Sequence, residues 1–417
     1  MTKFLLSLTI SVCLFSCNRS VEQNSKTIRI PGEFEPQEAL WLGFETVQSS
    51  RRKDTVSIKM IQAIHPFVKL NLIIEHDSLA PNIMRELYGE GIDTSNITLV
   101  YQSPTDVWYR DPGPIYCITP ENKLAVVDFK YTNYRNVPPD SIGEKAIAHE
   151  GIDRDIAKRM NLDTINSIVA IEGGAFETNG KGVLVQVEAV TLGRNPHLSK
   201  EQIEKDFARC CGMEKVIWLP RGVADDPHNF DRIIDNIFGF ATGGHTDEFV
   251  RFANDSTILL SWVAKEERYN NPINEMNYEI LNTNYNILAN ATNTDGKKFN
   301  IIKVPHPGSK LKTVVVDQEW YDRDNWKEKF DKFNVKPKDT ILWSYAKSYL
   351  NYLLTNGIVV IPQYGDINGP MNPKDRVVHE LFAKLYPDRK VVGINPLFFN
   401  DGGGGMHCRF QTQPKIK

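Results

Sequence analysis

A strand–turn–strand unit that recurs along the chain constrains the fold more than any other feature. Each copy begins with a cluster of glycines and charged residues, and an apolar strand, a polar turn and a second apolar strand follow. The copies are "RDPGPIYCITPENKLAVVDF", "EGGAFETNGKGVLVQVEAV", "GHTDEFVRFANDSTILLSW" and "SYLNYLLTNGIVVIPQYG", and their turns contain Glu121 and Asn122, Asn179 and Gly180, Asn254 and Asp255, and Asn356 and Gly357. These pairs have hairpin chemistry. Repeats of this kind, closed into a ring, would bring the starts of their first strands together at one centre.

Segments with helical periodicity alternate with the strands, which predicts a mixed α/β fold. The segment "VSIKMIQAIHPFVKL" places Ile58, Ile61, Ile64 and Val68 on one helical face, and "LNLIIEH" follows as a strand. Near the other end of the chain, "RVVHELFAKLY" and "KVVGI" repeat this order. The repeating unit is therefore expected to contain a helix as well as a hairpin.

The first residues have the layout of a bacterial export signal. Lys3 precedes a short apolar stretch that ends in "LFSC" at Cys17, which resembles the lipobox of bacterial lipoproteins. We predict a signal peptide of the lipoprotein type over residues 1–17, lipidation of Cys17 and a polar tether over residues 18–28. A soluble export signal and an uncleaved membrane anchor are the alternatives. An acylated Cys17 would hold the protein at the periplasmic or outer membrane surface.

Charge and cysteine content exclude several classes of protein. The formal net charge of −3 gives no basic surface for a nucleic acid, so no such partner is expected. Outside the leader four cysteines remain, too few for a disulfide scaffold, and their spacing resembles no zinc site. Cys210 and Cys211 lie in a helical pattern and are predicted to be buried thiols. We expect neither a metal nor a cofactor.

Polar residues gather where the recurring units begin. They are Asp111, Glu172, His245, Asp247, Asn351 and Cys408. A cysteine near a histidine can be a thiolate nucleophile with the histidine as acid and base, and a glutamate can orient the histidine. Two further aspartates suit a planar cation with several donors, namely a guanidinium. The four glycines of "GGGGMHC" would let the backbone carry Cys408 close to such a substrate.

The motifs also resemble those of the agmatine deiminase and bacterial (Porphyromonas-type) peptidylarginine deiminase family. The resemblance runs in order from about residue 30 to 414 through "FEPQEALWLGF", "WYRDPGPIY", "EGGAFETNGKG", "GGHTDEFVRF", "SYLNYLLTNGIVVIPQYGD" and "VVGINPLFFNDGGGGMHCRFQTQP". It implies one domain over residues 29–417 with the pentein fold, a fivefold pseudosymmetric α/β propeller. It also implies a site without cofactor at the propeller centre.

The resemblance gives each of these residues an expected role. Cys408 would be the nucleophile and His245 the acid and base, while Asp111 and Asp247 would clamp the guanidinium. Glu172 would orient His245 or the substrate, and Asn351 matches a position near the active site. His407 is interpreted as a packing or loop residue. The two aspartates should raise the pKa of the Cys408 thiol until a cationic substrate enters.

The substrate implied by the resemblance is agmatine or a C-terminal arginine of a peptide. Agmatine deiminases carry a stretch resembling "NAWGG" after the "RD" hairpin, whereas this chain reads "VDFKYTNYRNVPPD". The peptidylarginine branch has two arginines there that hold the substrate carboxylate; Arg135 matches one of them, and Asn133 stands at the other place. An amidinotransferase and a noncatalytic guanidinium-binding surface lipoprotein are the alternative functions.

Overall fold

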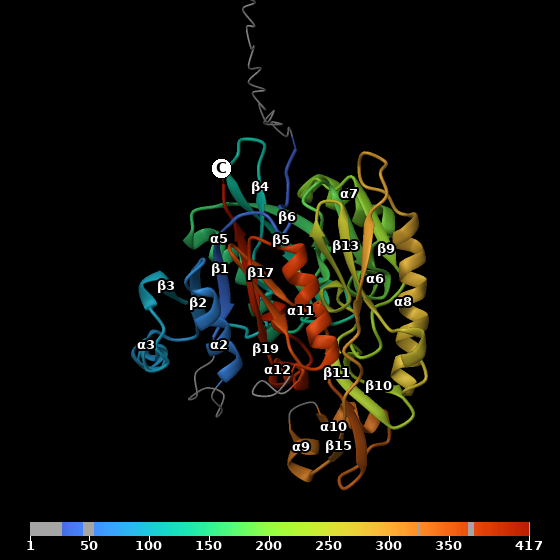
Figure 1. Ribbon diagram of the computed structural model, residues 1–417. Helices are drawn as coiled ribbons and strands as arrows, with labels where there is room; N and C mark the ends of the chain where they lie inside the picture. Colours follow the sequence, from blue (N-terminus) through green and yellow to red (C-terminus); the bar gives the residue numbers. More distant parts are fainter. Residues whose placement is uncertain (1–26, 45–53, 324–325, 366–370, 417) are drawn as a thin grey trace, which may run out of the picture.

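The computed structural model describes residues 27–44, 54–323, 326–365 and 371–416 (Figure 1), and most of its strands belong to five ββαβ units. In each unit two antiparallel strands are followed by a helix and by a strand parallel to the second. Four units are continuous in sequence: β4(Ile115–Ile118), β5(Leu124–Lys130), α5(Ile152–Arg159) and β6(Asp163–Ala170); β7(Glu177–Thr178), β8(Val183–Val187), α7(Lys200–Cys211) and β9(Lys215–Leu219); β12(Val250–Asn254), β13(Thr257–Trp262), α8(Pro272–Asn290) and β14(Asn300–Pro305); β17(Leu353–Thr355), β18(Ile358–Pro362), α11(Pro373–Leu385) and β19(Lys390–Ile394).

The fifth unit joins the two ends of the chain. β20(Phe410–Pro414) runs antiparallel to β1(Gln37–Gly43), and β1 pairs in parallel with β2(Lys69–Ile74) after the helix α2(Thr55–Ile64). A further strand, β3(Ile97–Tyr101), follows α3(Ala80–Gly89) and extends this sheet. No turn connects β20 to β1, so hairpin motifs could not reveal this unit. The C-terminal strand therefore belongs to the first sheet and completes the set of five.

The predicted turns and helices follow local backbone chemistry. Gly180 and Gly357 both have φ +68°, the left-handed conformation that glycine adopts without strain. The helix predicted across Val68 was too long, because α2 ends at Ile64. Pro66 has no N–H to donate to the next helical hydrogen bond, and Val68 is buried beyond the end of the helix. The predicted strand "KVVGI" coincides with β19.

The largest apolar core lies between neighbouring units and confirms the prediction for the adjacent cysteines. It includes Cys117 of β4, Val185 of β8 and Ile258 of β13. Cys210 and Cys211 on α7 are free thiols buried in the same core. They are packing residues of the propeller.

One more sheet, of four strands, lies outside the five units and was not predicted. Its strand order is β10(His228–Ile234), β11(Ile237–Thr242), β16(Thr340–Ser344) and β15(Leu311–Val315). The helices α9(Gln318–Asp322) and α10(Trp326–Lys332) lie against it at the bottom of Figure 1. Its core is aromatic, with the Phe230 ring 5.1 Å from that of Phe330.

Across the described residues, no helix combines the length and the hydropathy that a membrane span requires. The predicted signal peptide, Cys17 and most of the predicted tether lie outside the described residues.

Candidate active site

Each of the five units places a polar side chain just before its first strand. These residues are Asp111 before β4, Glu172 before β7, His245 and Asp247 before β12, Asn351 before β17 and Cys408 before β20. All six are buried, with at most 5% of their surface exposed. Repetition of one unit explains how residues so far apart in sequence reach a common centre.

Cys408 lies among hydrogen-bond donors and carboxylates. Its Sγ accepts a hydrogen bond from Nδ2 of Asn351 at 3.1 Å and one from the Gly405 N–H at 3.4 Å. Oδ2 of Asp247 lies 3.5 Å from the same sulfur. Burial, and then the charges of Asp247 and Glu248, raise the pKa of the Cys408 thiol well above its ordinary value. The expected direction is confirmed, and burial is the largest cause.

The glycines before Cys408 permit close approach, as expected. A Cβ on Gly405 would lie 2.3 Å from Oδ1 of Asn351, the residue that donates to the nucleophile. Gly403 has φ +90°, and a Cβ there would lie 2.2 Å from the carbonyl oxygen of Phe240. Side chains at these two positions would displace the segment that carries Cys408.

His245 lies between two carboxylates. Its Nδ1 is 3.7 Å from Oδ1 of Asp111, and its Nε2 is 3.4 Å from Oε2 of Glu172. Burial lowers the pKa of His245, but the charges of Asp111 and Glu172 outweigh burial and raise the pKa to about 9. His245 is therefore an imidazolium at neutral pH and can donate a proton.

Glu172 is held as a carboxylate by Arg194 on α6(Glu188–Arg194). The Nε of Arg194 donates to Oε1 of Glu172 at 2.8 Å, and its Nη2 donates to the Thr242 carbonyl at 2.7 Å. Burial raises the pKa of Glu172, but Arg194 and His245 together lower the pKa to about 2. The sequence analysis missed Arg194, which no motif marks.

Asp111 occupies the other side of His245. Its Oδ1 accepts a hydrogen bond from the Gly174 N–H at 2.9 Å, and its Oδ2 accepts one from the Tyr134 hydroxyl at 2.6 Å. Burial and the charge of Asp247 raise the pKa of Asp111 to about 7 against the opposing effect of His245. Asp111 therefore titrates near neutral pH until a cation stabilises its charged form.

Three of these groups converge at Gly174. A Cβ on this glycine would lie 2.6 Å from Nδ1 of His245, 2.9 Å from Oδ1 of Asp111 and 3.1 Å from Oδ2 of Asp247. The two aspartates and the histidine therefore face one small volume, which stays open because residue 174 has no side chain.

The two carboxylate oxygens of Asp247 differ in their hydrogen bonds. Its Oδ2 accepts a hydrogen bond from Nδ1 of His407 at 2.8 Å, whereas its buried Oδ1 has no hydrogen-bond partner among the described residues. Burial raises the pKa of Asp247, but His407 and His245 bring the pKa below its ordinary value. The Nε2 of His407 lies 2.9 Å from Oε2 of Glu33. His407 thus bridges two carboxylates, which its interpretation as a packing residue did not include.

Glu248 is a second buried carboxyl group beside the nucleophile. Its Oε1 accepts a hydrogen bond from Nδ2 of Asn351 at 2.8 Å and lies 4.0 Å from Sγ of Cys408. Burial, followed by the charge of Asp247, raises the pKa of Glu248 well above its ordinary value. Its place directly after Asp247 in "GHTDE" could have identified it.

Asp247, Glu248 and Cys408 each offer a potential metal ligand, and these atoms lie within 4.8 Å of one another. Asp247 and Glu248, however, already accept hydrogen bonds from His407 and Asn351. Burial raises the pKa of Glu248 and so disfavours the charged form that a metal ion would need. This donor set fits a guanidinium beside a thiol better than a metal ion.

Arg135 is the one predicted site residue that is not part of the buried group. It is exposed on a loop where Asn133 and Tyr134 have φ of +51° and +59°. Its guanidinium forms no hydrogen bond or ion pair with any other part of the chain that the structure describes. The loop is held by a hydrogen bond from Oγ1 of Thr132 to the Arg135 carbonyl at 2.8 Å. The preceding residue, Tyr134, reaches Asp111 and was missed by the sequence analysis.

Comparisons with known proteins agree with this geometry. The profile of the Porphyromonas-type peptidyl-arginine deiminase family matches residues 29–414. Agmatine deiminase from Medicago truncatula is 25% identical over 407 residues, which cover 93% of this chain and 96% of the relative.

Solved structures confirm the fold. The structure of agmatine deiminase from Enterococcus faecalis superposes with a TM-score of 0.73 at 26% identity and covers 94% of this chain and 98% of its own. The C. jejuni agmatine deiminase structure gives a TM-score of 0.65 at 20% identity and covers 93% and 96%. The predicted pentein fold is therefore correct.

Proposed function

The chain belongs to the Porphyromonas-type peptidyl-arginine deiminase family, and on this premise we propose that it hydrolyses a guanidinium group to a ureido group with release of ammonia. The main support for this proposal is the close approach of Asp111, Asp247 and His245 around Gly174. Two aspartates and a histidine face one small volume, and Asp247 also contacts the sulfur of Cys408. Paired carboxylates match the donors of a guanidinium, whereas a neutral amide would leave them uncompensated.

The first half of the reaction forms a covalent intermediate. The guanidinium cation offsets the negative charges around Cys408, so the thiol loses its proton to water as substrate enters. The thiolate attacks the guanidinium carbon and forms a C–S bond. His245, protonated at neutral pH, donates a proton to the leaving nitrogen, the C–N bond breaks, and ammonia departs from a thiouronium.

The second half returns the enzyme to its starting state. His245 is now neutral and removes a proton from a water molecule that attacks the thiouronium carbon. A C–O bond forms and the C–S bond breaks, the proton of the new hydroxyl passes to the departing sulfur, and the ureido product leaves the Cys408 thiol. Glu172 orients His245 throughout, because its own carboxylate is held by Arg194.

The substrate is either agmatine or a peptide that ends in arginine. The exposed Arg135 guanidinium favours the peptide, because it directly follows Tyr134, which contacts Asp111, and could pair with a C-terminal carboxylate. The family match and the agmatine deiminase relatives support the shared reaction, and they support both substrates.

Product analysis tests the proposal. The chain lacking its first 20 residues is incubated with agmatine, free arginine and a peptide ending in arginine, beside Cys408→Ala. We expect ureido product and ammonia in equal amounts from one of these substrates, and none from Cys408→Ala. Binding of all three without product would favour the noncatalytic alternative. Transfer of the amidino group to an added amine, without ammonia, would favour an amidinotransferase.

We also propose that the protein is exported and anchored by a lipid on Cys17. The signal layout of residues 1–17 supports this, although these residues lie outside the described structure. Labelling of growing cells with a radioactive fatty acid should mark the wild-type chain and leave Cys17→Ser unlabelled. Equal labelling of both chains would exclude the anchor at this residue.

A further inference from the structure

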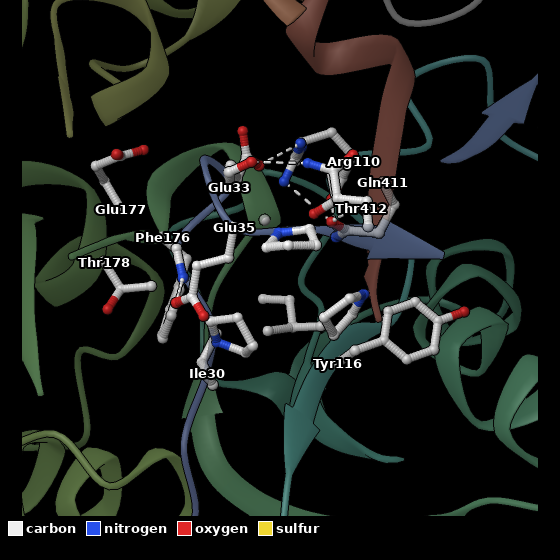
Figure 2. A pocket seen from close by; sticks show the side chains of 17 residues that line it. Ile30, Glu33, Glu35, Arg110, Tyr116, Phe176, Glu177, Thr178, Gln411 and Thr412 are labelled. Atoms are coloured by element: carbon white, nitrogen blue, oxygen red, sulfur yellow. Dashed lines mark hydrogen bonds and ion pairs between the residues drawn. The ribbon is translucent and has the colours of Figure 1, made fainter. Parts of the chain in front are cut away.

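A chain of charged and polar groups runs from Asp247 in the active site to Glu33, which lines a cavity. His407 lies between Asp247 and Glu33, with its Nδ1 2.8 Å from Oδ2 of Asp247 and its Nε2 2.9 Å from Oε2 of Glu33. Glu33 lines the cavity shown in Figure 2, together with Arg110 and Glu177. The mechanism above uses Asp247 and leaves His407 and Glu33 without a role.

Glu33 is held firmly from two other units. Nη2 of Arg110 lies 2.5 Å from its Oε1, and Nη2 of Arg251 lies 2.5 Å from its Oε2. Figure 2 shows Arg110 between Glu33 and Gln411, to which it donates at 3.0 Å. Burial raises the pKa of Glu33, but Arg110 and His407 bring the pKa well below its ordinary value. Glu33 is therefore a fixed carboxylate.

The geometry around His407 requires a donor on each ring nitrogen. A neutral imidazole has one N–H donor and one acceptor nitrogen. Here both nitrogens face carboxylates, Asp247 and Glu33, which accept hydrogen bonds and donate none. The other charged or titratable groups nearby are Arg110 and Arg251, which pair with Glu33, and the Cys408 thiol next in the chain. The ring therefore donates to both carboxylates.

We propose that His407 is a positioning residue that Glu33 holds in place, and that its hydrogen bond to Oδ2 fixes the Asp247 carboxylate beside Gly174 and Cys408, where the guanidinium binds. This inference rests on the proposed function, because it assigns Asp247 to substrate. Oδ2 of Asp247, which accepts the hydrogen bond from Nδ1 of His407, is also the oxygen that lies 3.5 Å from Sγ of Cys408. The inference also gives a role to the contact between Glu33, near the start of the chain, and His407, which directly precedes the nucleophile.

Glu33→Ala tests the proposal, and Glu35→Ala is its matched control. Glu35 lines the same cavity and forms an ion pair with Arg29 at 2.6 Å. Unlike Glu33, it has no hydrogen bond or ion pair with His407 in the described structure. Both substitutions are placed in the Cys408→Ala chain, so that calorimetry measures agmatine binding without turnover. We expect Glu33→Ala to weaken binding by about tenfold and Glu35→Ala by less than about twofold. Equal effects, or none from Glu33→Ala, would overturn the proposal.

Two substitutions of His407 provide a second test if thermal unfolding shows that Glu33→Ala does not fold. The amide of His407→Asn lies near the position of Nδ1 and can still donate to Asp247. The longer His407→Gln places its amide nearer Nε2 and loses this contact. Binding should survive in His407→Asn within about threefold and fall by about tenfold or more in His407→Gln. The opposite order would contradict the proposal.

Nitrogen NMR of the histidine-labelled protein separates this proposal from the proposed function. The His407 signals are assigned by their loss in His407→Asn. Two protonated ring nitrogens at neutral pH support the bridge, and a single one overturns it. If the Cys408→Ala chain binds neither agmatine nor a peptide ending in arginine, the proposed function fails, and this spectrum still decides on the bridge.

Discussion

The hydroxyl of Tyr134 donates a hydrogen bond to Oδ2 of Asp111 at 2.6 Å. The Tyr134 ring also lies 6.1 Å from the ring of His245, so one side chain touches the proposed clamp and faces the proposed acid. The hydrogen bond favours the charged form of Asp111 and thus limits the rise of its pKa, which burial brings to about 7. Tyr134 keeps part of Asp111 ionised at neutral pH.

Tyr134→Phe should therefore move the acid limb of the activity profile to higher pH. Without the hydroxyl the pKa of Asp111 rises further, so a larger share of the clamp is protonated and cannot bind a cation. We expect kcat/KM at neutral pH to fall by about three- to tenfold and to approach the wild-type value near pH 8.5. Steady-state kinetics across this range provide the measurement.

Tyr131→Phe is the control for this prediction. The Tyr131 ring lies 5.9 Å from that of Tyr134, but its hydroxyl faces Asn133 at 3.4 Å rather than Asp111. The acid limb of this variant should stay in place. A similar shift in both variants would indicate general damage to the loop.

A guanidinium cation should activate the Cys408 thiol towards alkylation. Burial and nearby carboxylates raise the pKa of this thiol, so iodoacetamide should react slowly at neutral pH. Millimolar guanidinium chloride should accelerate labelling by about tenfold, because its charge offsets that of Asp247. Mass spectrometry of the labelled peptide measures the rate.

Asp247→Asn provides the complementary variant. It removes a negative charge beside the sulfur, so labelling should be faster without any cation, and added guanidinium should have little effect. Cys117 is an internal reference, because burial raises its pKa to about 12 and it should stay unlabelled. An unchanged rate in Asp247→Asn would remove electrostatic repulsion as the cause of slow labelling.

Features that depend on residues close together in the chain, such as the hairpin turns, could be predicted from the sequence. Turn pairs such as Asn356 and Gly357 identified the four continuous hairpins, since each turn needs residues that tolerate its backbone geometry. No turn joins β20 to β1, so the pairing of these two strands could be inferred only from the closure of the repeating units into a ring. Polar residues before buried strands marked the site, because burial of charge requires a partner or a function.

Residues that act through long-range contacts could not be found in the same way. Glu33 and His407 are 374 residues apart in the chain and meet only because the ring closes. Arg194 resembles any helical arginine until the fold places it against Glu172. Arg135 matches a family motif, but it is exposed, and its role depends on the substrate rather than on contacts within the chain.

Gly174→Ala should abolish most activity without unfolding the protein. The added methyl group would lie 2.6 Å from Nδ1 of His245 and 2.9 Å from Oδ1 of Asp111, inside the volume assigned to the guanidinium. We expect kcat/KM to fall by about a hundredfold, since a small displacement of catalytic groups has an effect of this order. Gly89→Ala, where no atom beyond its chain neighbours and its own helix backbone lies within 4 Å of the new Cβ, should behave as wild type. A melting temperature lowered as much as activity would point to misfolding instead.

Arg135→Gln should separate the two candidate substrates. If Arg135 pairs with a substrate carboxylate, the KM for a peptide ending in arginine should rise by about tenfold, while that for agmatine, which lacks a carboxylate, should stay constant. The ratio of the two KM values is the measurement, and agmatine serves as the internal control. A parallel rise for both substrates would argue that Arg135 supports the loop rather than the carboxylate.

Glu172 should make the stability of the fold depend on pH in the acid range. Arg194 and His245 hold the pKa of Glu172 at about 2 against burial, below its ordinary value of 4.5, so folding favours the charged form. This contribution is present above about pH 4.5 and is lost as the pH falls towards 2; the shift corresponds to about 3 kcal/mol in the free energy of unfolding. Glu172→Gln should lack this pH-dependent part, while the exposed Glu201→Gln, which loses a surface pair with Lys205, should follow the wild type. Urea unfolding at a series of pH values measures the difference, and a gap between wild type and Glu172→Gln that stays constant down to pH 2 would contradict the assigned ionisation of Glu172.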